Sequence, residues 1–470
     1  MSTPKQTRQA AAQQPTGALK GTTLAQAVSW ALDQAIFGHL KVHGNTTWQA
    51  WDLILLTITW VWSDDATLTG AFAEARRWSL DVLGRVAVTS YQGLLKALVR
   101  WTPIWLPLVW QQLHQVMEEH GGAHQRIGRW LALAVDGSRV SVPRTQDNEK
   151  AFTAPHYGKG KTARYRNKNG KKNKRPKTKK PQPVQPQIWL TLLWHLGLRM
   201  PWSWKTGPSY SAEREHFRQL LAEQVFPQKT LFCADAGFVG YDLWRTIHQA
   251  GHALVIRVGA NVKLLRRLGY VREKTGIVYC WPNKQARRGQ PPLVLRLFRL
   301  RVGRCVMHLV SNVLDEEALS EALVCRLYQL RWGVELQFRT LKQTFKRRQL
   351  RSRTPARAYV ELDWSLVGLW LIQLFVVKEQ LAIGQLPQQA SVALAIAVVR
   401  DTMQRWWERP EEAFVTKLQA ARQDDYQRHR SKKARYQPRY KDKPKAGKPV
   451  LHNATSWHKA RLRQWLRTVG

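Results

Sequence analysis

Apolar residues recur along this chain with two different periods, and the periods divide it into regions. Between residues 24 and 125, Trp- and Leu-rich segments such as AQAVSWALDQAIFGHL and LVWQQLHQVM have helical spacing. The next region is dominated by short apolar runs bounded by glycine or proline, which are typical of buried strands. Apolar segments with helical character return between about 350 and 407. The pattern therefore predicts an α/β chain with helical flanks.

The middle region contains a recognisable order of elements. Strands are predicted at 131–135, in a pair around residues 196–197, at 231–234 and in HALVIRVG, with helices beginning near Ser211 and Tyr241. Three strands followed by helix, strand, helix and strand is the order of a ribonuclease-H-like fold. Residues 258–318 then alternate and are rich in β-branched side chains, which predicts further strands. The predicted fold class is α/β: a ribonuclease-H-like core interrupted by a β-rich insertion, with a helical N-terminal domain and a helical, basic C-terminal region.

Polar and basic segments complete the predicted organisation. We expect residues 1–23 to be disordered, 24–125 to be helical, 126–257 with 319–407 to form the core, and 258–318 to be the insertion. A basic loop at 157–187 interrupts the core, and twelve Lys or Arg with no acid occupy positions 159–180. Residues 408–470 read as a basic tail, and we favour a disordered DNA-binding extension over a dimer contact.

The amino-acid composition indicates which kinds of partner the chain binds. Lys and Arg exceed Asp and Glu by 43 charges, and so basic a chain binds polyanions, although ribosomal and membrane-surface proteins share this property. The four cysteines have no metal spacing, which favours free thiols in a reducing cytoplasm. The first residues lack the apolar core of a signal peptide, and the apolar runs are too short for a membrane span.

Two aspartates follow predicted strands. Asp136 comes after the apolar run 131–135 and Asp235 after 231–234, and each is followed closely by glycine. Acids at the carboxyl ends of strands are where open α/β sheets place their chemistry. Taken singly, each aspartate is better explained as a turn or N-cap residue ahead of a helix, and only together with the third group does the functional interpretation become the stronger one.

A third group lies in YQLRWGVELQFRTLKQTF, which we predict to be one helical run. At about 100° per residue, Tyr328, Arg331, Glu335 and Lys342 fall on one stripe roughly 60° wide. A core-facing stripe would be apolar. The plain alternative is a solvated face with an Arg331–Glu335 pair, which contributes little to stability.

Together these residues resemble the YREK signature of bacterial insertion-sequence transposases of family four, the cut-and-paste DDE group. The spacing Tyr328-x2-Arg331-x3-Glu335-x6-Lys342 carries the resemblance, and AVDGS and CADAGF around Asp136 and Asp235 agree with it. The resemblance implies that the β-rich insertion helps to form a hairpin at the DNA end and to hold a flipped base. It also implies that the N-terminal region recognises terminal inverted repeats, although a helical packing cap fits the same pattern.

The resemblance further implies the roles of individual residues. Asp136, Asp235 and Glu335 would be catalytic and would hold two Mg²⁺ ions, with Mn²⁺ as a substitute, which agrees with the preference of Mg²⁺ for carboxylates. Tyr328, Arg331 and Lys342 would grip a DNA phosphate, for which Arg and Lys are suited. Arg257 is a further candidate for DNA contact. Trp281 is the candidate for base stacking, although an ordinary core tryptophan is the favoured interpretation.

The expected function is therefore DNA transposition. The enzyme would hydrolyse one strand at the element end, form a hairpin and transfer the freed end to target DNA. Its partners would be double-stranded DNA and a second copy of the chain in a synaptic homodimer, in the bacterial cytoplasm at the nucleoid and without a membrane. Two alternatives stay open: a ribonuclease-H-like nuclease without strand transfer, and a transposase-derived DNA-binding protein.

Overall fold

The computed structural model describes residues 24–38, 48–153, 185–302, 305–405, 414–423 and 447–469. These residues form two compact units. The first takes its residues from 1–94, 107–121 and 367–425, and the second from 95–106, 122–366 and 426–470. Both α5 (Tyr91–His120) and α12 (Pro355–Ala382) contribute residues to each unit. The predicted disordered segment 1–23 and nearly all of the basic loop 157–187 lie outside the described residues.

The described residues of the first unit are helical. Besides the parts of α5 and α12, the unit contains α1 (Leu24–Ala31), α2 (Ala35–Gly38), α3 (Ala50–Trp62), α4 (Leu68–Leu83), η4 (Pro387–Gln389), α13 (Val392–Gln404) and α14 (Phe414–Ala420).

Helix α3 is the centre of this first unit. All thirteen of its residues are buried, and the indole of Trp62 donates to the carbonyl of Gly368 at 2.8 Å. The Arg400 side chain donates to the Trp62 carbonyl at 3.0 Å. The N-terminal helices therefore share their core with helices from residues 367–425, because α13 packs against both α1 and α3.

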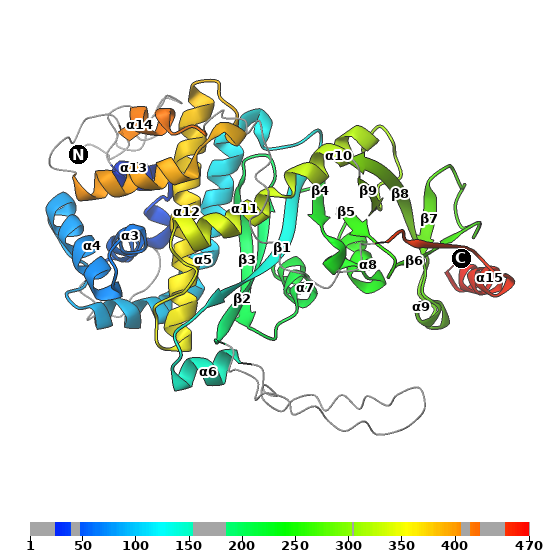
Figure 1. Cartoon of the computed structure of the whole chain (residues 1–470), viewed down its shortest axis with the longest axis horizontal. Coiled ribbons are helices and arrows are strands. Elements are labelled where there is room, and N and C mark those ends of the chain that lie inside the picture. The colour runs from blue at the N-terminus through cyan, green and yellow to red at the C-terminus, as the bar shows by residue number, and fades with distance from the viewer. Residues whose placement is uncertain are drawn as a thin grey trace, which may run out of the picture. The chain divides into compact units, whose positions relative to one another are not determined.

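The second unit is built on one ten-stranded sheet (Figure 1). Its strand order is β10-β6-β7-β8-β9-β5-β4-β1-β2-β3. The strands are β1 (Leu131–Ser141), β2 (Gln187–His195), β3 (Met200–Pro208), β4 (Thr230–Ala234), β5 (Ala253–Val258), β6 (Lys263–Arg266), β7 (Ile277–Cys280), β8 (Leu293–Val302), β9 (Cys305–Ser311) and β10 (Val450–Asn453).

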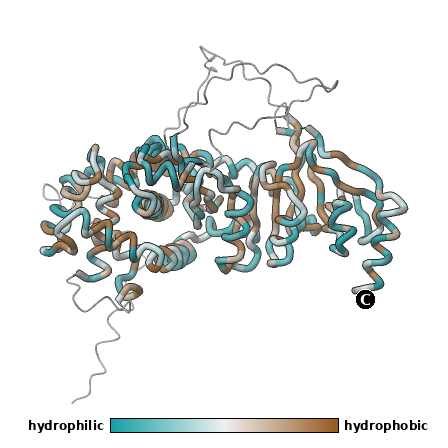
Figure 2. Tube along the Cα trace, turned by 90° about the horizontal axis from the view of Figure 1, so that it is seen from below, coloured by the Kyte–Doolittle hydropathy of each residue, from teal (hydrophilic) through white to brown (hydrophobic). Residues whose placement is uncertain are grey.

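The sheet changes character at β5. Strands β1, β2 and β3 are antiparallel neighbours, whereas β4 pairs in parallel with β1 and with β5. Beyond β5 the insertion strands β9, β8, β7 and β6 continue the same sheet in antiparallel fashion. Long hydrophobic stretches run along the strands (Figure 2), and all five residues of β4 are buried. The insertion is thus an extension of the core sheet.

The second unit also contains helices and turns. They are η1 (Gly122–His124), α6 (Gln146–Phe152), α7 (Glu213–Glu223), η2 (Ala236–Phe238), α8 (Tyr241–Gln249), α9 (Asn283–Arg287), α10 (Glu321–Leu330), α11 (Gly333–Arg339), the π-helix η3 (Thr340–Thr344) and α15 (Ser456–Val469). Helix α7 packs against β1, β2 and β3, α8 against β5, and α11 against β1.

The expectation of a disordered basic tail is wrong for residues 447–469. Strand β10 pairs in parallel with β6 through Val450–Lys263 and Asn453–Arg266, and α15 packs against α9. The tail looked disordered because it has few apolar residues, but β6 offers a free edge whose backbone groups β10 satisfies. Residues 424–446 lie outside the described part of the chain.

One helix in the described residues, α12, is long and apolar enough to cross a membrane by length and composition. Its most apolar window is 94% buried inside the protein. This burial is typical of the core helix of a folded protein.

Candidate active site

Asp136 and Asp235 lie side by side where the parallel pairing of β1 with β4 stops. The last paired residues are Val135 and Ala234, and Asp136 and Asp235 directly follow them in the sequence. Neighbouring strands lie about 4.8 Å apart. Two sequence segments about a hundred residues apart are therefore brought to adjacent positions by one register.

The prediction that Asp136 ends its strand is wrong. Strand β1 continues to Ser141, and Asp136 is paired with Leu192 of the antiparallel neighbour β2. What ends at this point is the parallel partner β4, because Asp235 begins the turn η2 and accepts the Gly237 N–H at 2.7 Å. Asp136 likewise accepts the Gly137 N–H at 2.9 Å. Asp235 is therefore both a turn residue and a neighbour of Asp136.

Glu335 comes to β1 on helix α11, which packs against that strand. The approach depends on Gly333, the first residue of α11. A Cβ atom at Gly333 would meet the ring of Trp194 on β2 at 2.0 Å, which is far inside van der Waals contact. Only glycine permits this packing, so a tight helix–sheet contact sets the position of Glu335.

The prediction of one continuous helix through residues 328–345 is wrong. Helix α10 ends at Leu330, α11 begins at Gly333, and a π-helix follows from Thr340 to Thr344. At the first break the Val334 N–H donates to the Arg331 carbonyl, three residues earlier in the chain. In the π-helix the Phe345 N–H donates to the Thr340 carbonyl, five residues earlier. Such π segments often occur at functional sites. The contact of Gly333 with the sheet gives a physical reason for the first break.

Arg331 is the buried, positively charged residue beside Glu335. Its side chain is 4% exposed, and Nη2 lies 3.2 Å from Oε1 of Glu335. The guanidinium carbon also lies 5.3 Å from the ring centroid of Tyr328. Tyr328 is itself 2% exposed, and burial raises the pKa of its hydroxyl. Its ring supports Arg331 and has almost no surface open to DNA, so its contact with DNA stays a prediction.

Lys342 reaches the same strand from the π-helix. Its Nζ donates to Oγ of Ser138 at 2.6 Å. Ser138 is two residues beyond Asp136, and side chains two apart in a strand share a face. The ammonium group is therefore held on the face of β1 that carries the first aspartate. Burial lowers the pKa of Lys342, and the charge of Arg348 adds to this effect.

The electrostatics of Asp136 reflect this crowding of acids. Burial first, and then the charges of Asp235 and Glu335, raise the pKa of Asp136 to about 6. The hydrogen bond from Gly137 and the charge of Arg331 oppose the rise. Burial is thus the main cause of the shift, and the charges of the two other acids add to it.

The sequence analysis missed one acid of this site, Glu213, at the start of α7. Burial, followed by the charges of Asp136 and Asp235, raises the pKa of Glu213 to about 7. In the sequence it looks like an ordinary first-turn acid. The glycines that follow both aspartates were the available signal, since they leave room for another side chain.

Two further predicted residues lie on the insertion side of the unit. Arg257, on β5, is paired with Leu309 of β9, and its charge helps to lower the pKa of Tyr328 against the effect of burial. Trp281 is 3% exposed, and its indole donates to the Gln290 carbonyl at 2.7 Å. It is packed as a core tryptophan, which was the favoured interpretation of the sequence.

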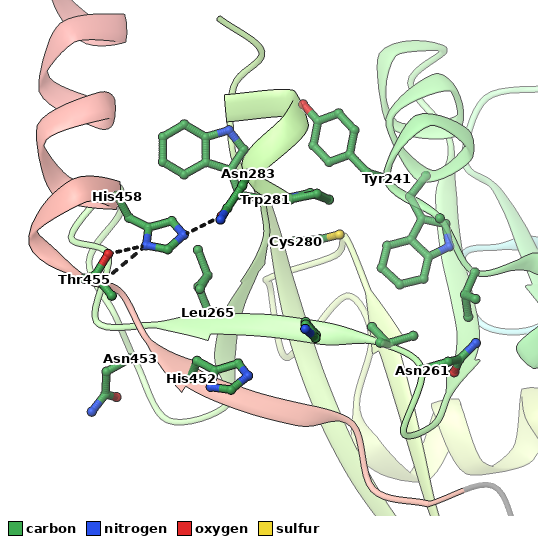
Figure 3. A pocket seen from close by; sticks show the side chains of 16 residues that line it. Tyr241, Asn261, Leu265, Cys280, Trp281, Asn283, His452, Asn453, Thr455 and His458 are labelled. Atoms are coloured by element: carbon green, nitrogen blue, oxygen red, sulfur yellow. Dashed lines mark hydrogen bonds between the residues drawn. The ribbon is translucent and has the colours of Figure 1, made fainter. Parts of the chain in front are cut away.

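Trp281 also lines a cavity of about 730 Å³ between the insertion and the C-terminal segment (Figure 3). On one side of this cavity, His458 bonds to Thr455 at 2.8 Å and to Asn283 at 3.1 Å. None of the acids Asp136, Asp235 and Glu335 lines this cavity. The contact of Trp281 with DNA stays a prediction.

The acids are suited to a hard cation by their chemistry. They are all oxygen donors, they lie on neighbouring elements, and they repel one another unless a positive charge is added. Within the described residues, no three His, Cys, Asp or Glu side chains lie close enough to hold one ion among them. Glu335 is engaged by Arg331, and each aspartate accepts a nearby backbone N–H. The metal-binding role of the three acids therefore stays a prediction.

One comparison with known families matches the part of the chain that contains these acids. The family model of the transposase DDE domain matches residues 131–371, a range that begins with β1 and contains Asp136, Asp235 and Glu335. Transposase InsG for insertion sequence element IS4 of Escherichia coli (strain K12) is 27% identical over 282 residues. That alignment covers 57% of this chain and 57% of the relative.

Among solved structures, a cryo-EM structure of the piggyBac transposase synaptic complex with hairpin DNA is similar with a TM-score of 0.39 and 13% identity. The alignment covers 84% of this chain and 82% of that one.

Proposed function

The chain belongs to the transposase DDE domain family, and from this premise we propose that it catalyses cut-and-paste transposition of an insertion sequence. The observation that carries the proposal is the adjacency of Asp136 and Asp235 at the end of the β1–β4 pairing, with Glu335 on a helix packed against β1. The strand order β3-β2-β1-β4-β5 supports a ribonuclease-H-like core around these acids.

Asp136, Asp235 and Glu335 are the residues that would hold the divalent cations, Mg²⁺ or Mn²⁺. When bound, a pair of such ions activates an attacking oxygen and stabilises the leaving oxygen of a phosphodiester. The protein's part is to place the carboxylates on rigid elements. The register of two strands fixes the aspartates, and the contact between Gly333 and Trp194 fixes Glu335.

The cationic side chains would hold the DNA backbone beside these acids. Lys342, anchored on Ser138, presents an ammonium on the Asp136 face of β1. Arg331, stacked on Tyr328, would offer its guanidinium to a phosphate if Glu335 turned to a cation. In this proposal Tyr328 positions Arg331, and Arg257 contributes positive charge nearby.

The later steps extend this proposal. The freed 3′-hydroxyl would attack the opposite strand to give a hairpin, and the reopened end would attack target DNA. One set of carboxylates serves every step because each step is an in-line attack at a phosphodiester. Two DNA ends require two copies of the chain, so we propose a synaptic homodimer acting in the bacterial cytoplasm. The N-terminal helices would recognise the terminal inverted repeats.

The test is Mg²⁺-dependent cleavage of a labelled duplex carrying the DNA end next to this gene. Wild-type protein should cut at the end and join it to target DNA, whereas Glu335→Gln should bind the duplex without cutting. Glu215→Gln is the matched control, because Glu215 lies on the surface of α7 and pairs with Arg218. Cutting without joining would identify a nuclease instead. Binding without cutting by wild type, in Mg²⁺ and Mn²⁺ alike, would identify a DNA-binding protein.

A further inference from the structure

Helix α15 carries a row of positive side chains on its exposed face. Lys459, Arg463 and Arg467 are exposed and follow one another at intervals of four residues, which places them on one side of the helix. We call these three residues the α15 stripe. The helix contains no Asp or Glu, and within the described part of the chain the stripe residues have no ion pair or hydrogen bond.

The opposite face of α15 is used by the fold. Leu462 is 4% exposed, and the ring of Trp465 lies edge-on to that of Tyr270 with centroids 5.7 Å apart. The imidazole of His458 bonds to Asn283, the first residue of α9, at 3.1 Å (Figure 3). These contacts attach α15 to the insertion, so the stripe is not needed to hold the helix in place.

The plain alternative is a solvated helix face, which usually carries charges of both signs. Helix α7 of the same unit has such a face, where Arg218 pairs with Glu215 and Lys205 of β3 pairs with Glu223. In the α15 stripe, neighbours four residues apart have like charges, which destabilises a helix. The first turn, where the helix dipole favours an acid, contains Lys459 instead. The stripe therefore weakens α15 unless an anionic partner covers it.

Helix α9, which packs against α15, extends this positive surface. Lys284, Arg287 and Arg288 are all exposed. An acid also touches α9, because Asp242 accepts the Gln285 amide at 2.8 Å. The two packed helices still present six exposed cations, and such a cluster attracts polyanions.

The length of the stripe fits a nucleic-acid backbone. From Lys459 to Arg467 the helix rises about 12 Å, and one strand of duplex DNA carries about three phosphates over that length. Basic amphipathic helices also bind anionic membranes, but they do so by burying an apolar face in the lipid. In α15 the apolar residues Leu462 and Trp465 pack against the protein. Duplex DNA is therefore the better partner.

We propose that the α15 stripe, together with α9, binds the backbone of duplex DNA without regard to its sequence. The inference rests on the proposed function, which makes DNA the partner, and adds a surface distant from the acids. Strand β10, which leads into α15, lies seven positions from β1 in the strand order of the sheet, or roughly 30 Å along it. The surface thus holds DNA away from the reacting phosphates.

The experiment is the salt dependence of binding to a labelled duplex of unrelated sequence, measured by fluorescence anisotropy with the full chain in EDTA. The triple variant Lys459→Gln, Arg463→Gln, Arg467→Gln should reduce the slope of log K against log salt by about 2.7, because each phosphate contact contributes about 0.9. Binding should weaken on the order of 10²-fold at about 0.1 M salt. Near-UV circular dichroism checks the fold.

A charge-matched control separates this surface from the net charge of the chain. Arg129→Gln, Lys229→Gln, Arg326→Gln removes the same number of exposed cations from other segments of the second unit. Its slope should change by less than about 1. Equal losses in the two triple variants would show that only net charge matters and would overturn the inference.

Arg463→Glu distinguishes binding from a structural role. It places an acid four residues from both Lys459 and Arg467, so the melting temperature should rise, whereas duplex binding should weaken more than in Arg463→Gln. Weaker binding with a lower melting temperature in both variants would make Arg463 a structural residue and contradict the inference.

Two further results would also overturn it. One is a triple variant of the stripe that binds the duplex with the affinity and slope of wild type. The other is wild-type protein that binds phosphatidylserine vesicles but no duplex. A cleavage assay separates the two proposals. If the stripe is needed for duplex binding but wild type cuts no element end, the surface stands and the transposase function fails. If wild type cuts and joins ends while the stripe variant keeps the wild-type slope, only the surface fails.

Discussion

Carboxylates in the two halves of the sheet have opposite environments. In the insertion half, Glu273 accepts the Arg267 and Gly269 N–H groups at 2.9 and 2.8 Å and the Tyr279 hydroxyl at 2.9 Å. Although partial burial opposes it, these bonds lower the pKa of Glu273. In the core half, Asp136 accepts one adjacent N–H and faces other acids, and its pKa rises to about 6.

The opposite pKa shifts show that the charge of Glu273 supports the fold, whereas the charge of Asp136 weakens it. Glu273 closes the loop between β6 and β7 with three donors, so its charge is stabilised when the protein folds. The charge of Asp136 is destabilised by folding, because burial and its neighbours penalise it. Strain of this kind is characteristic of functional sites. One unit thus carries a carboxylate whose charge the fold stabilises and another whose charge the fold penalises.

The largest expected effect is on catalysis. Asp235→Asn should lower metal-dependent cleavage of a DNA end by at least about 10³-fold, because it removes a charge that acts only with the cation and the reacting phosphate. Glu273→Gln should cleave within about twofold of wild type, since its carboxylate is used by the loop. Single-turnover cleavage rates measure both. Equal losses in the two variants would remove the distinction between the halves.

A change in packing should have the next largest effect. Gly333→Ala places a methyl group 2.0 Å from the Trp194 ring, so α11 must shift and carry Glu335 with it. We expect cleavage to fall on the order of 10²-fold and unfolding free energy to fall by about 1–3 kcal/mol.

The control for this change is Gly38→Ala, because a Cβ atom at Gly38 would have nothing within 4 Å. Its cleavage rate should equal that of wild type, and its stability should change by less than about 1 kcal/mol. Full activity of Gly333→Ala would show that the contact with Trp194 does not position Glu335.

Removing the strained acid should stabilise the fold. The pKa of Asp136 is about 6 when folded, above its ordinary value of 3.8, so the folded state binds the proton more tightly. Stability should therefore fall as pH rises from about 4 to about 6 and stay low above that range. Asp136→Asn should raise the unfolding free energy by about 1–3 kcal/mol at pH 8 in EDTA, and by less at pH 4. Urea denaturation at the two pH values tests this, and a destabilised variant at pH 8 would contradict it.

The smallest effect belongs to the structural acid and has the opposite sign. Because the pKa of Glu273 is lowered in the folded protein, its contribution to stability is present above its unfolded pKa and is lost as pH falls through the folded value. Glu273→Gln should cost about 1 kcal/mol or less at pH 7, because solvent screens the exposed group. The cost should disappear in strong acid. A stabilised variant at pH 7 would erase the contrast with Asp136.

The sequence predicted the core strands well, because buried strands leave a local signal, whereas the roles of the residues in the YREK pattern stay predictions. It did not predict that β1 continues beyond Asp136, since only its partner strand β4 ends there. It also missed the breaks around Gly333, which depend on a ring from β2. Glu213 was missed for the same reason: its meaning comes from contacts with glycines 76 and 24 residues away in sequence. The pairing of β10 with β6 was equally invisible, because it joins short strands distant in the chain.

The most direct test of the central claim, that the acids of the core half are kept for a divalent cation, is the effect of Mn²⁺ on thermal stability. A ligand that binds only the folded state stabilises it by RT ln(1 + [L]/Kd), which is about 2.7 kcal/mol at a hundredfold excess over Kd. We expect Mn²⁺ to raise the melting temperature of wild-type protein and to leave that of the Asp136→Asn, Asp235→Asn double variant unchanged. An equal rise in both proteins, or none in the wild type, would contradict the account.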